Sequence, residues 1–186
     1  MHAVIFDIDG TLLQSAAVDD ALYRQAVAEV LGDVRLRATL HDYEHVTDTG
    51  ILSSIFTDNE LERDVRRENA VRARFVELLD AHIAVHGPFR EIPGAADLLH
   101  ALQASPRHAV AMATGGWRQS AELKLRSAHI EYANVPLFTA DDDSARTGIM
   151  KLALAGLGGA LVLHRGAHVP LQPPAGAQHD HLHVGA

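Results

Sequence analysis

An apolar strand that ends in a turn rich in carboxylates is the most constraining feature of this sequence. Residues His2 to Ile8 form a short apolar run with β-branched residues, and the string Asp7-Ile8-Asp9-Gly10 ends it. Short continuous apolar runs of this kind are typical of strands that are buried on both faces of a parallel sheet. We therefore expect an α/β chain in which helices cover a parallel, Rossmann-like sheet.

The later segments alternate in the same way. Apolar runs predict a second strand over His108 to Ala113, a shorter third over Pro136 to Thr139, and a fourth over Ala160 to Leu163. Helical spacing of apolar residues and terminal Gly or Pro residues predict the intervening helices: one after Pro93-Gly94, one over Trp117 to Ala128 and one over Ala145 to Ala155.

Residues 14–92 interrupt this alternation. Two helices are expected there, one over Val18 to Leu31 and a long one from about Glu60 to Gly87, with an irregular polar segment from His41 to Ser54 between them. An excursion of this length is best explained as a helical cap inserted after the first strand. The expected domains are an α/β core (1–13 and 93–165), a helical cap (14–92) and an irregular Pro/Gly/His-rich tail (166–186).

Composition limits the classes of function. The 186 residues suit one domain with an insertion, and the net charge of −8 argues against a protein that binds nucleic acid by broad phosphate neutralisation. The absence of Cys excludes disulfide scaffolds, thiolate metal sites and Cys nucleophiles. The longest apolar run, Leu152 to Leu163, is too short to cross a bilayer, so a cytoplasmic protein without a membrane partner is expected. The sequence does not determine the oligomeric state.

The string Asp7-Ile8-Asp9-Gly10-Thr11-Leu12 carries the clearest chemistry. Residues i and i+2 share one face of a strand, but the chain is leaving the strand here and Gly10 permits an unusual turn. Asp9 can therefore turn back towards a ligand beside Asp7. A strand that merely ends in a polar Asp-Gly turn is the structural alternative.

This string resembles the first motif of the haloacid dehalogenase superfamily, in its phosphatase branch. The inserted helices resemble the cap of phosphoglycolate phosphatases and β-phosphoglucomutases. The resemblance implies that Asp7 is the nucleophile that forms an aspartyl-phosphate and that Asp9 is the general acid/base. It also implies that Gly10 and Thr11 contact phosphate, and that Mg²⁺ binds the Asp7 carboxylate and the Asp9 backbone carbonyl.

The string Thr114-Gly115-Gly116-Trp117 resembles the second motif of the family, at the end of the second strand. A hydroxyl group and backbone N–H groups at the start of the following helix can hold a phosphoryl oxygen, which assigns Thr114, Gly115 and Gly116 to phosphate binding. A glycine-rich turn between strand and helix is the alternative.

The third family motif supplies a lysine that neutralises the charge of phosphate and nucleophile. Lys124 and Lys151 are the only lysines in the chain. Lys124 is the preferred candidate because it lies in the helix that follows the second motif, and Lys151 remains the alternative.

The fourth motif should supply acidic residues at the end of the fourth strand, and the sequence departs from the family there. Ala160 to Leu163 leads into His164-Arg165-Gly166, and Asp180 is the only acidic residue after Asp143. Asp141 to Asp143 follow the third strand, so they are expected to cap the next helix or to order the site indirectly. The resemblance stops near residue 155, and the C-terminal part of the fold is expected to be truncated or divergent.

Two further segments leave alternatives open. The polar stretch His45 to Gly50 is either a substrate-reading loop that faces the site or an ordinary exposed loop. The cluster His179-Asp180-His181-Leu182-His183 could chelate a transition metal, but a Pro/Gly-rich tail without such a role is the favoured interpretation.

These expectations combine into one functional hypothesis. The chain is expected to be a Mg²⁺-dependent phosphatase that hydrolyses a small phosphorylated metabolite, although a phosphomutase would look the same in sequence. The alternative is a catalytically impaired binding or interaction module that lacks the metal ligand of the fourth motif.

Overall fold

A parallel sheet forms the centre of the molecule. The structure is a computed structural model that describes residues 1–158, and its three strands have the order β1-β2-β3. Strand β1 (His2–Phe6) pairs in parallel with β2 (His108–Ala113), and β2 pairs in parallel with β3 (Leu137–Phe138). The expected α/β fold class is confirmed.

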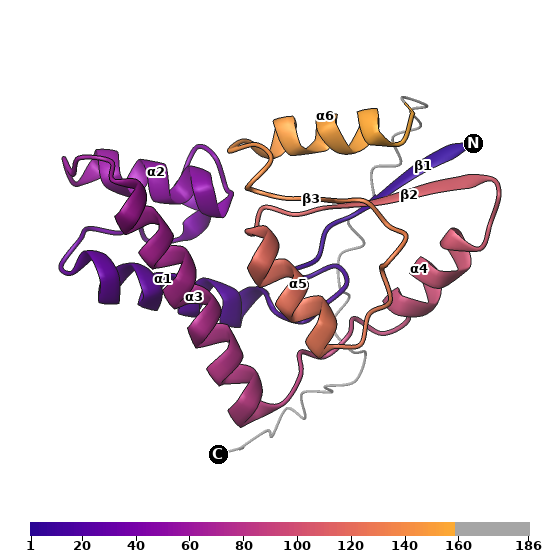
Figure 1. The fold of residues 1–186 in the computed structure, drawn as a ribbon, viewed down its shortest axis with the longest axis horizontal. Coiled ribbons are helices and arrows are strands. Elements are labelled where there is room, and N and C mark those ends of the chain that lie inside the picture. Colours follow the sequence, from indigo (N-terminus) through magenta and orange to yellow (C-terminus); the bar gives the residue numbers. More distant parts are fainter. Residues whose placement is uncertain (159–186) are drawn as a thin grey trace, which may run out of the picture.

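Helices cover both faces of this sheet. Figure 1 shows α6 (Arg146–Gly156) on one side of the strands, and α4 (Ala95–Gln103) and α5 (Arg118–Ser127) on the other. The side chains of β2 alternate accordingly, because Ala111 and Ala113 belong to the apolar cluster of α6 while Val110 and Met112 belong to the main core. This alternation is the period of two that a strand imposes.

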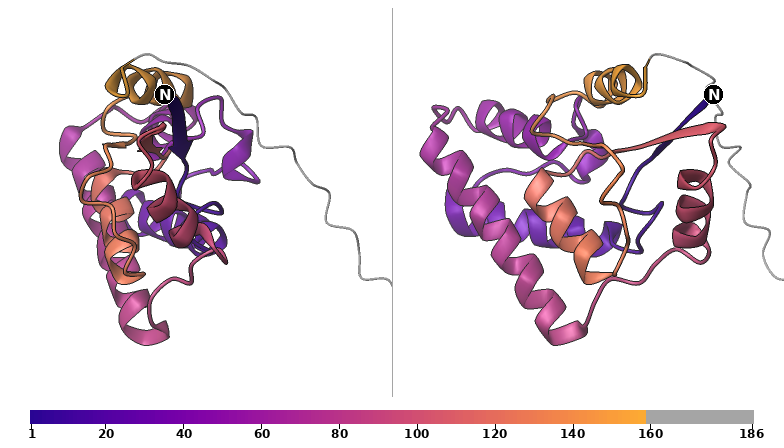
Figure 2. Two further views of the ribbon diagram at one scale, coloured as in Figure 1. Left: turned by 90° about the vertical axis from the view of Figure 1, so that its right-hand side faces the viewer. Right: turned by 45° about the vertical axis from the view of Figure 1, so that its right-hand side comes forward.

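The excursion between β1 and α4 is helical, as expected, but it contains three α-helices where two were predicted. These are α1 (Ala16–Leu31), α2 (Asp48–Asp58) and α3 (Val65–His86), with a short 3-10 helix η1 (Leu40–Asp42) after α1. Helix α1 packs against α3, and α3 packs against α5 of the core. Both views in Figure 2 show α1 and α3 next to each other, with α5 close to α3.

The prediction of an irregular segment from His41 to Ser54 was therefore wrong from Asp48 onward. The Thr47 hydroxyl accepts the Gly50 N–H at 3.0 Å, which caps the N-terminus of α2. Apolar residues with helical spacing then bury one face of α2: Ile51, Leu52, Ile55 and Phe56. The polar first turn concealed this helix in the sequence.

The long helix α3 begins later than expected. Glu60 has a φ of +52°, which is incompatible with a helix at that position, and the Asp64 carboxylate caps the helix by accepting the Arg66 N–H. The fourth expected strand, Ala160 to Leu163, and the tail 166–186 lie outside the described residues. None of the helices in residues 1–158 combines the length and the apolar character that a membrane span requires.

Candidate active site

The turn after β1 folds the chain back on itself. The Ile8 carbonyl accepts the N–H groups of Thr11, Leu12 and Leu13 at 2.9 to 3.2 Å, and Gly10 adopts a φ of +79°. Ile8 and Leu12 are fully buried and anchor the turn in the core. Asp7 and Asp9 therefore leave the strand on a fixed scaffold, whereas the Thr11 side chain is exposed.

Asp7 is partly exposed at the end of β1. One carboxylate oxygen accepts the Ile8 N–H at 2.8 Å, and the other accepts from the Arg146 guanidinium at 3.1 Å. Arg146 opens helix α6, and its Nε also donates to the Val46 carbonyl at 2.9 Å. One exposed guanidinium thus connects the expected nucleophile to the helical segment.

Asp9 is held from two sides. The Ser15 hydroxyl donates to Oδ1, and the Lys124 ammonium lies 2.7 and 2.8 Å from the two carboxylate oxygens. Lys124 comes from α5, is fully buried, and also pairs with Asp19 in the first turn of α1. Lys151, the alternative third-motif lysine, lies exposed on α6, whereas Lys124 lies beside one first-motif carboxylate, that of Asp9.

The buried charged groups around Lys124 shift one another's pKa values. Burial alone would lower the pKa of Lys124, but the carboxylates of Asp19 and Asp9 outweigh burial and hold this pKa above the ordinary lysine value. Burial raises the pKa of Asp19 to about 6, and Lys124 opposes that rise. Lys124 is therefore a permanent cation, and Asp19 titrates in the range where many enzymes work.

The turn after β2 contains the second motif. Thr114 is buried, and its hydroxyl accepts the Gly116 N–H at 3.1 Å. The carbonyl of Gly115 accepts the N–H of Asp48 at 2.8 Å, and the Trp117 N–H at the start of α5 donates to the Asp48 carboxylate at 2.8 Å. A carboxylate from the helical segment thus lies at the N-terminus of α5, where anions are favoured.

The stretch Val46 to Thr49 docks on the core along its whole length. The Thr47 and Thr49 hydroxyls donate to the carbonyls of Ser144 and Ala140 at 2.6 and 2.8 Å. The approach is so close at Gly115 that a Cβ there would lie 2.9 Å from the Val46 carbonyl oxygen. The stretch His45 to Gly50 faces the site through Val46, Thr47 and Asp48, but its last three residues open helix α2 instead of forming a loop.

A cavity of about 170 Å³ lies next to these groups, and some of them line it. Its carboxylates are Asp9, Asp19, Asp20 and Asp48, and its other polar lining includes His41, Thr47, Thr114, Gly115, Gly116 and Arg146. Arg146 and Asp19 were not predicted from the sequence, since neither lies at a strand end where a local pattern could have revealed it. Of the predicted site residues, Asp7, Gly10, Thr11 and Lys124 do not line this cavity; Asp7 lies next to it through its pair with Arg146.

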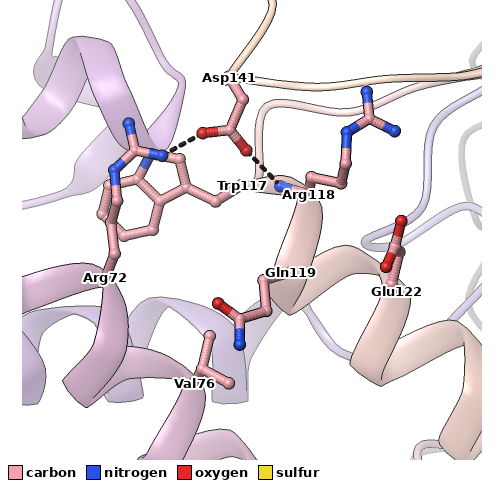
Figure 3. Close-up of a pocket in the computed structure, with 7 residues that line it drawn as sticks. All are labelled: Arg72, Val76, Trp117, Arg118, Gln119, Glu122 and Asp141. Carbon is pink, nitrogen blue, oxygen red and sulfur yellow. Dashed lines mark hydrogen bonds and ion pairs between the residues drawn. The ribbon is translucent and has the colours of Figure 1, made fainter. Parts of the chain in front are cut away.

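A second cavity of about 280 Å³ lies between α3 and α5 (Figure 3). The Arg72 guanidinium lies 4.7 Å from the centre of the Trp117 ring and pairs with Asp141. The other carboxylate oxygen of Asp141 accepts the Arg118 N–H at 2.7 Å. Trp117 itself is buried and packs against Tyr23 and Phe75, which accounts for it as a packing residue.

The acidic run after β3 stays away from the first-motif carboxylates. Asp141 binds the start of α5, Asp142 pairs with Arg118, and Asp143 accepts the Ala145 N–H just before α6 at 2.7 Å. The expected helix cap is wrong, because the N-cap of α6 is Ala145 and no side chain in the described part of the chain caps its first turn; Asp143 binds the loop just before the helix, and Asp141 and Asp142 bind Arg118.

A Mg²⁺ ion is compatible with the oxygen atoms beside Asp7. Residues 1–158 contain no group of three or more Asp, Glu, His or Cys side chains arranged to hold a metal. Mg²⁺, however, usually takes only one or two carboxylates and keeps water and substrate phosphate as its other ligands. Asp7 pairs only with the exposed Arg146 side chain, and within the described residues the Asp9 carbonyl accepts no backbone hydrogen bond.

Comparison with known proteins identifies relatives of this arrangement. The family model for haloacid dehalogenase-like hydrolases matches residues 1–160. A search of curated proteins finds no match.

Several solved structures share the fold. A hydrolase from Pseudomonas syringae is 19% identical with a TM-score of 0.65, and the match covers 84% of this chain and 70% of that one. CbbY from Rhodobacter sphaeroides, solved with phosphate, is 18% identical with a TM-score of 0.56 and coverages of 84% and 72%. A Lactobacillus plantarum protein assigned as a phosphoglycolate phosphatase is 20% identical with a TM-score of 0.52 and coverages of 84% and 71%.

Proposed function

The chain belongs to the haloacid dehalogenase-like hydrolases, and from this premise we propose that it hydrolyses a small phosphate monoester through an aspartyl-phosphate at Asp7. The observation that carries the proposal is the contact of Asp7 with Arg146, which lines the same cavity as Asp9 and Thr114. A nucleophile and an acid/base from the turn after β1 thereby lie close to a cation from α6.

In the first step, an Asp7 carboxylate oxygen forms a bond to phosphorus while the bond from phosphorus to the ester oxygen breaks. The leaving alkoxide takes a proton from Asp9. In the second step, Asp9 takes a proton from water, the hydroxide attacks phosphorus, and the acyl-phosphate bond breaks to release phosphate and restore Asp7. The hydrogen bonds of Ser15 and Lys124 support this role because they fix the orientation of the Asp9 carboxylate.

Two cations would balance the negative charge of the reacting groups. Arg146 lies against Asp7 and is exposed enough to turn towards a phosphoryl oxygen, which makes it a second candidate for the charge-neutralising role expected of Lys124. Lys124 contacts Asp9 and Asp19 and would act on phosphate only across the Asp9 carboxylate. We assign Arg146 to phosphate and nucleophile, and Lys124 to the positioning of Asp9.

A bound Mg²⁺ would be held by the Asp7 carboxylate and the Asp9 carbonyl. It would supply Lewis-acid stabilisation of the phosphoryl oxygens. Thr114 would support the opposite side of the phosphoryl group with its hydroxyl, and Gly115 would support it with its backbone N–H group, while the Gly116 N–H holds the Thr114 hydroxyl in place. Residues 14–92 would act as the cap that excludes water from the cavity.

The test is release of phosphate from p-nitrophenyl phosphate with added Mg²⁺, measured for the wild type and for Asp7→Asn. We expect activity in the wild type that EDTA abolishes and that falls at least about 10³-fold in Asp7→Asn. Asp80→Asn, an equal change of charge on the exposed side of α3, should keep full activity. Equal background rates in the wild type and Asp7→Asn would instead favour the binding-module alternative.

A further inference from the structure

The cavity beside the proposed nucleophile has an unusual charge pattern on the side that the helical segment provides. Asp19, Asp20 and Asp48 line it from this segment, and no lysine or arginine among residues 14–92 does so. Its arginine, Arg146, comes from α6 and already pairs with Asp7. The side that would face the alcohol part of a substrate therefore presents three carboxyl groups, together with His41, and no lysine or arginine of residues 14–92.

Three of the four cavity carboxylates already have a cation. Asp9 and Asp19 share Lys124, and Asp20 pairs with Arg24 at 2.7 Å. Asp48 has none within the described residues. Its Oδ2 accepts the Trp117 N–H at 2.8 Å, while Oδ1 accepts no hydrogen bond from residues 1–158.

The unpartnered oxygen of Asp48 faces accessible space. The Asp48 residue is only 6% exposed, yet no fully buried side-chain oxygen or nitrogen in the described chain lacks a partner. Oδ1 must therefore reach the surface that remains, which is the wall of the cavity that Asp48 lines. Burial and the neighbouring Asp19 raise the pKa of Asp48 well above its usual range, as expected for a carboxylate whose charge is not compensated.

We propose that the substrate is the phosphate monoester of an amino alcohol, whose ammonium group donates to Asp48 in this cavity. The inference rests on the proposed phosphatase function, and it adds the chemistry of the leaving group. An ammonium group would supply both the donor and the positive charge that Asp48 lacks. A carboxylate or a second phosphate at the same place would meet Asp48 and Asp20, and residues 1–158 offer it no lysine or arginine in the cavity that is not already paired.

The size of the cavity agrees with such a substrate. About 170 Å³ is below the usual range of pockets for drug-sized ligands, so it suits a phosphoryl group with a short chain. The R. sphaeroides protein in the structural comparison has also been solved with xylulose-1,5-bisphosphate. A preference for a substrate with an ammonium group would distinguish this chain from that protein, whose bound ligand carries a second phosphate.

Three esters that differ only in their distal group test the proposal: 2-aminoethyl phosphate, 2-hydroxyethyl phosphate and 2-phosphoglycolate. Their kcat/KM values are measured for the wild type, Asp48→Asn and Asp80→Asn. Their Kd values are measured by calorimetry on Asp7→Asn and on Asp7→Asn combined with Asp48→Asn, so that selectivity is read without turnover.

We expect the aminoethyl ester to exceed phosphoglycolate by about tenfold or more in both measurements, with the neutral ester between them. Asp48→Asn should reduce the ratio between the aminoethyl and hydroxyethyl esters towards one, and Asp80→Asn should leave that ratio unchanged. Because the two esters are compared within one variant, any general loss of activity caused by a disturbed Asp48 contact cancels in their ratio.

The two proposals fail differently. If p-nitrophenyl phosphate is hydrolysed in an Asp7-dependent way but phosphoglycolate matches the aminoethyl ester, the leaving-group inference alone is overturned. An unchanged aminoethyl preference in Asp48→Asn also overturns it. If no ester is hydrolysed but the ammonium ester still binds best and depends on Asp48, the phosphatase function fails and the ammonium site stands. If the protein shows neither turnover of any ester nor selective binding of the ammonium ester, both proposals are rejected.

Discussion

The Lys124 ammonium lies 2.7 and 2.8 Å from the two carboxylate oxygens of Asp9, a residue 115 positions earlier in the chain. The same ammonium pairs with Asp19 at the start of α1. One fully buried cation thus joins the turn after β1, the helix after β2 and the first helix of the inserted segment. Because each partner depends on the others for charge compensation, the three elements are expected to become ordered together.

Lys124→Met should destabilise the fold strongly. The methionine fills a similar volume but leaves the carboxylates of Asp9 and Asp19 without their cation, a change that typically costs about 3–5 kcal/mol in the free energy of unfolding. Guanidinium chloride denaturation measures it. Lys151→Met is the matched control, because Lys151 is exposed on α6 and its loss should change stability by about 0.5 kcal/mol or less. Equal effects of the two substitutions would contradict the central position of Lys124.

Asp19 should make stability depend on pH in a direction opposite to ordinary salt-bridged carboxylates. Its pKa is about 6 in the folded protein against an ordinary value of 3.8. Between these values the folded state retains a proton that the unfolded state has released, so ionisation of Asp19 lowers the free energy of unfolding as the pH rises. The stability of Asp19→Asn relative to the wild type should therefore increase by about 1–3 kcal/mol from pH 4 to pH 7.

Urea denaturation of both proteins at pH 4, 5, 6 and 7 measures this difference. Taking the difference cancels the groups that the two proteins share. A difference that is flat or that decreases with pH would show that the Lys124 pair compensates Asp19 fully.

Arg146→Gln should reduce phosphatase activity more than its exposed position suggests. The substitution removes the cation beside Asp7 and the bond to the Val46 carbonyl. Loss of one charge-stabilising donor typically lowers kcat by about 10²-fold or more. Steady-state kinetics with p-nitrophenyl phosphate measures the loss, and Arg126→Gln, which removes an exposed arginine from α5, should leave kcat unchanged. A normal kcat in Arg146→Gln would indicate that Lys124, and not Arg146, neutralises the charge of the phosphate and the nucleophile.

Two adjacent glycines should differ in their tolerance of a methyl group. A Cβ on Gly115 would lie 2.9 Å from the Val46 carbonyl oxygen, and the backbone must shift to admit it. A Cβ on Gly116 would find no heavy atom nearer than the Thr114 hydroxyl at 3.6 Å. Thermal unfolding should therefore show a loss of about 1–3 kcal/mol for Gly115→Ala and little change for Gly116→Ala. Similar losses in the two variants would mean that the backbone of Val46 to Thr49 can move away from the new methyl group at little cost in free energy.

The three strands were predictable because apolar runs between polar turns report burial directly. Helices α1, α5 and α6 were also predictable to within two residues at each end, since their apolar residues recur at helical spacing. Helix α2 was missed because its start depends on the Thr47 hydroxyl bond to Gly50, which leaves no apolar signal in the first turn. The late start of α3 depends in the same way on one backbone angle at Glu60.

The sequence alone determined the fold class, the family resemblance and the pair Asp7 and Asp9, because these depend on local patterns within a few residues. Only the tertiary structure decided which cations serve them and what else faces the cavity. Lys124, Arg146 and Asp48 reach the site from α5, α6 and α2, at separations along the chain that no local pattern encodes. Electrostatic partners are chosen by distance in space and by burial, and both arise only when the helical segment packs onto the sheet.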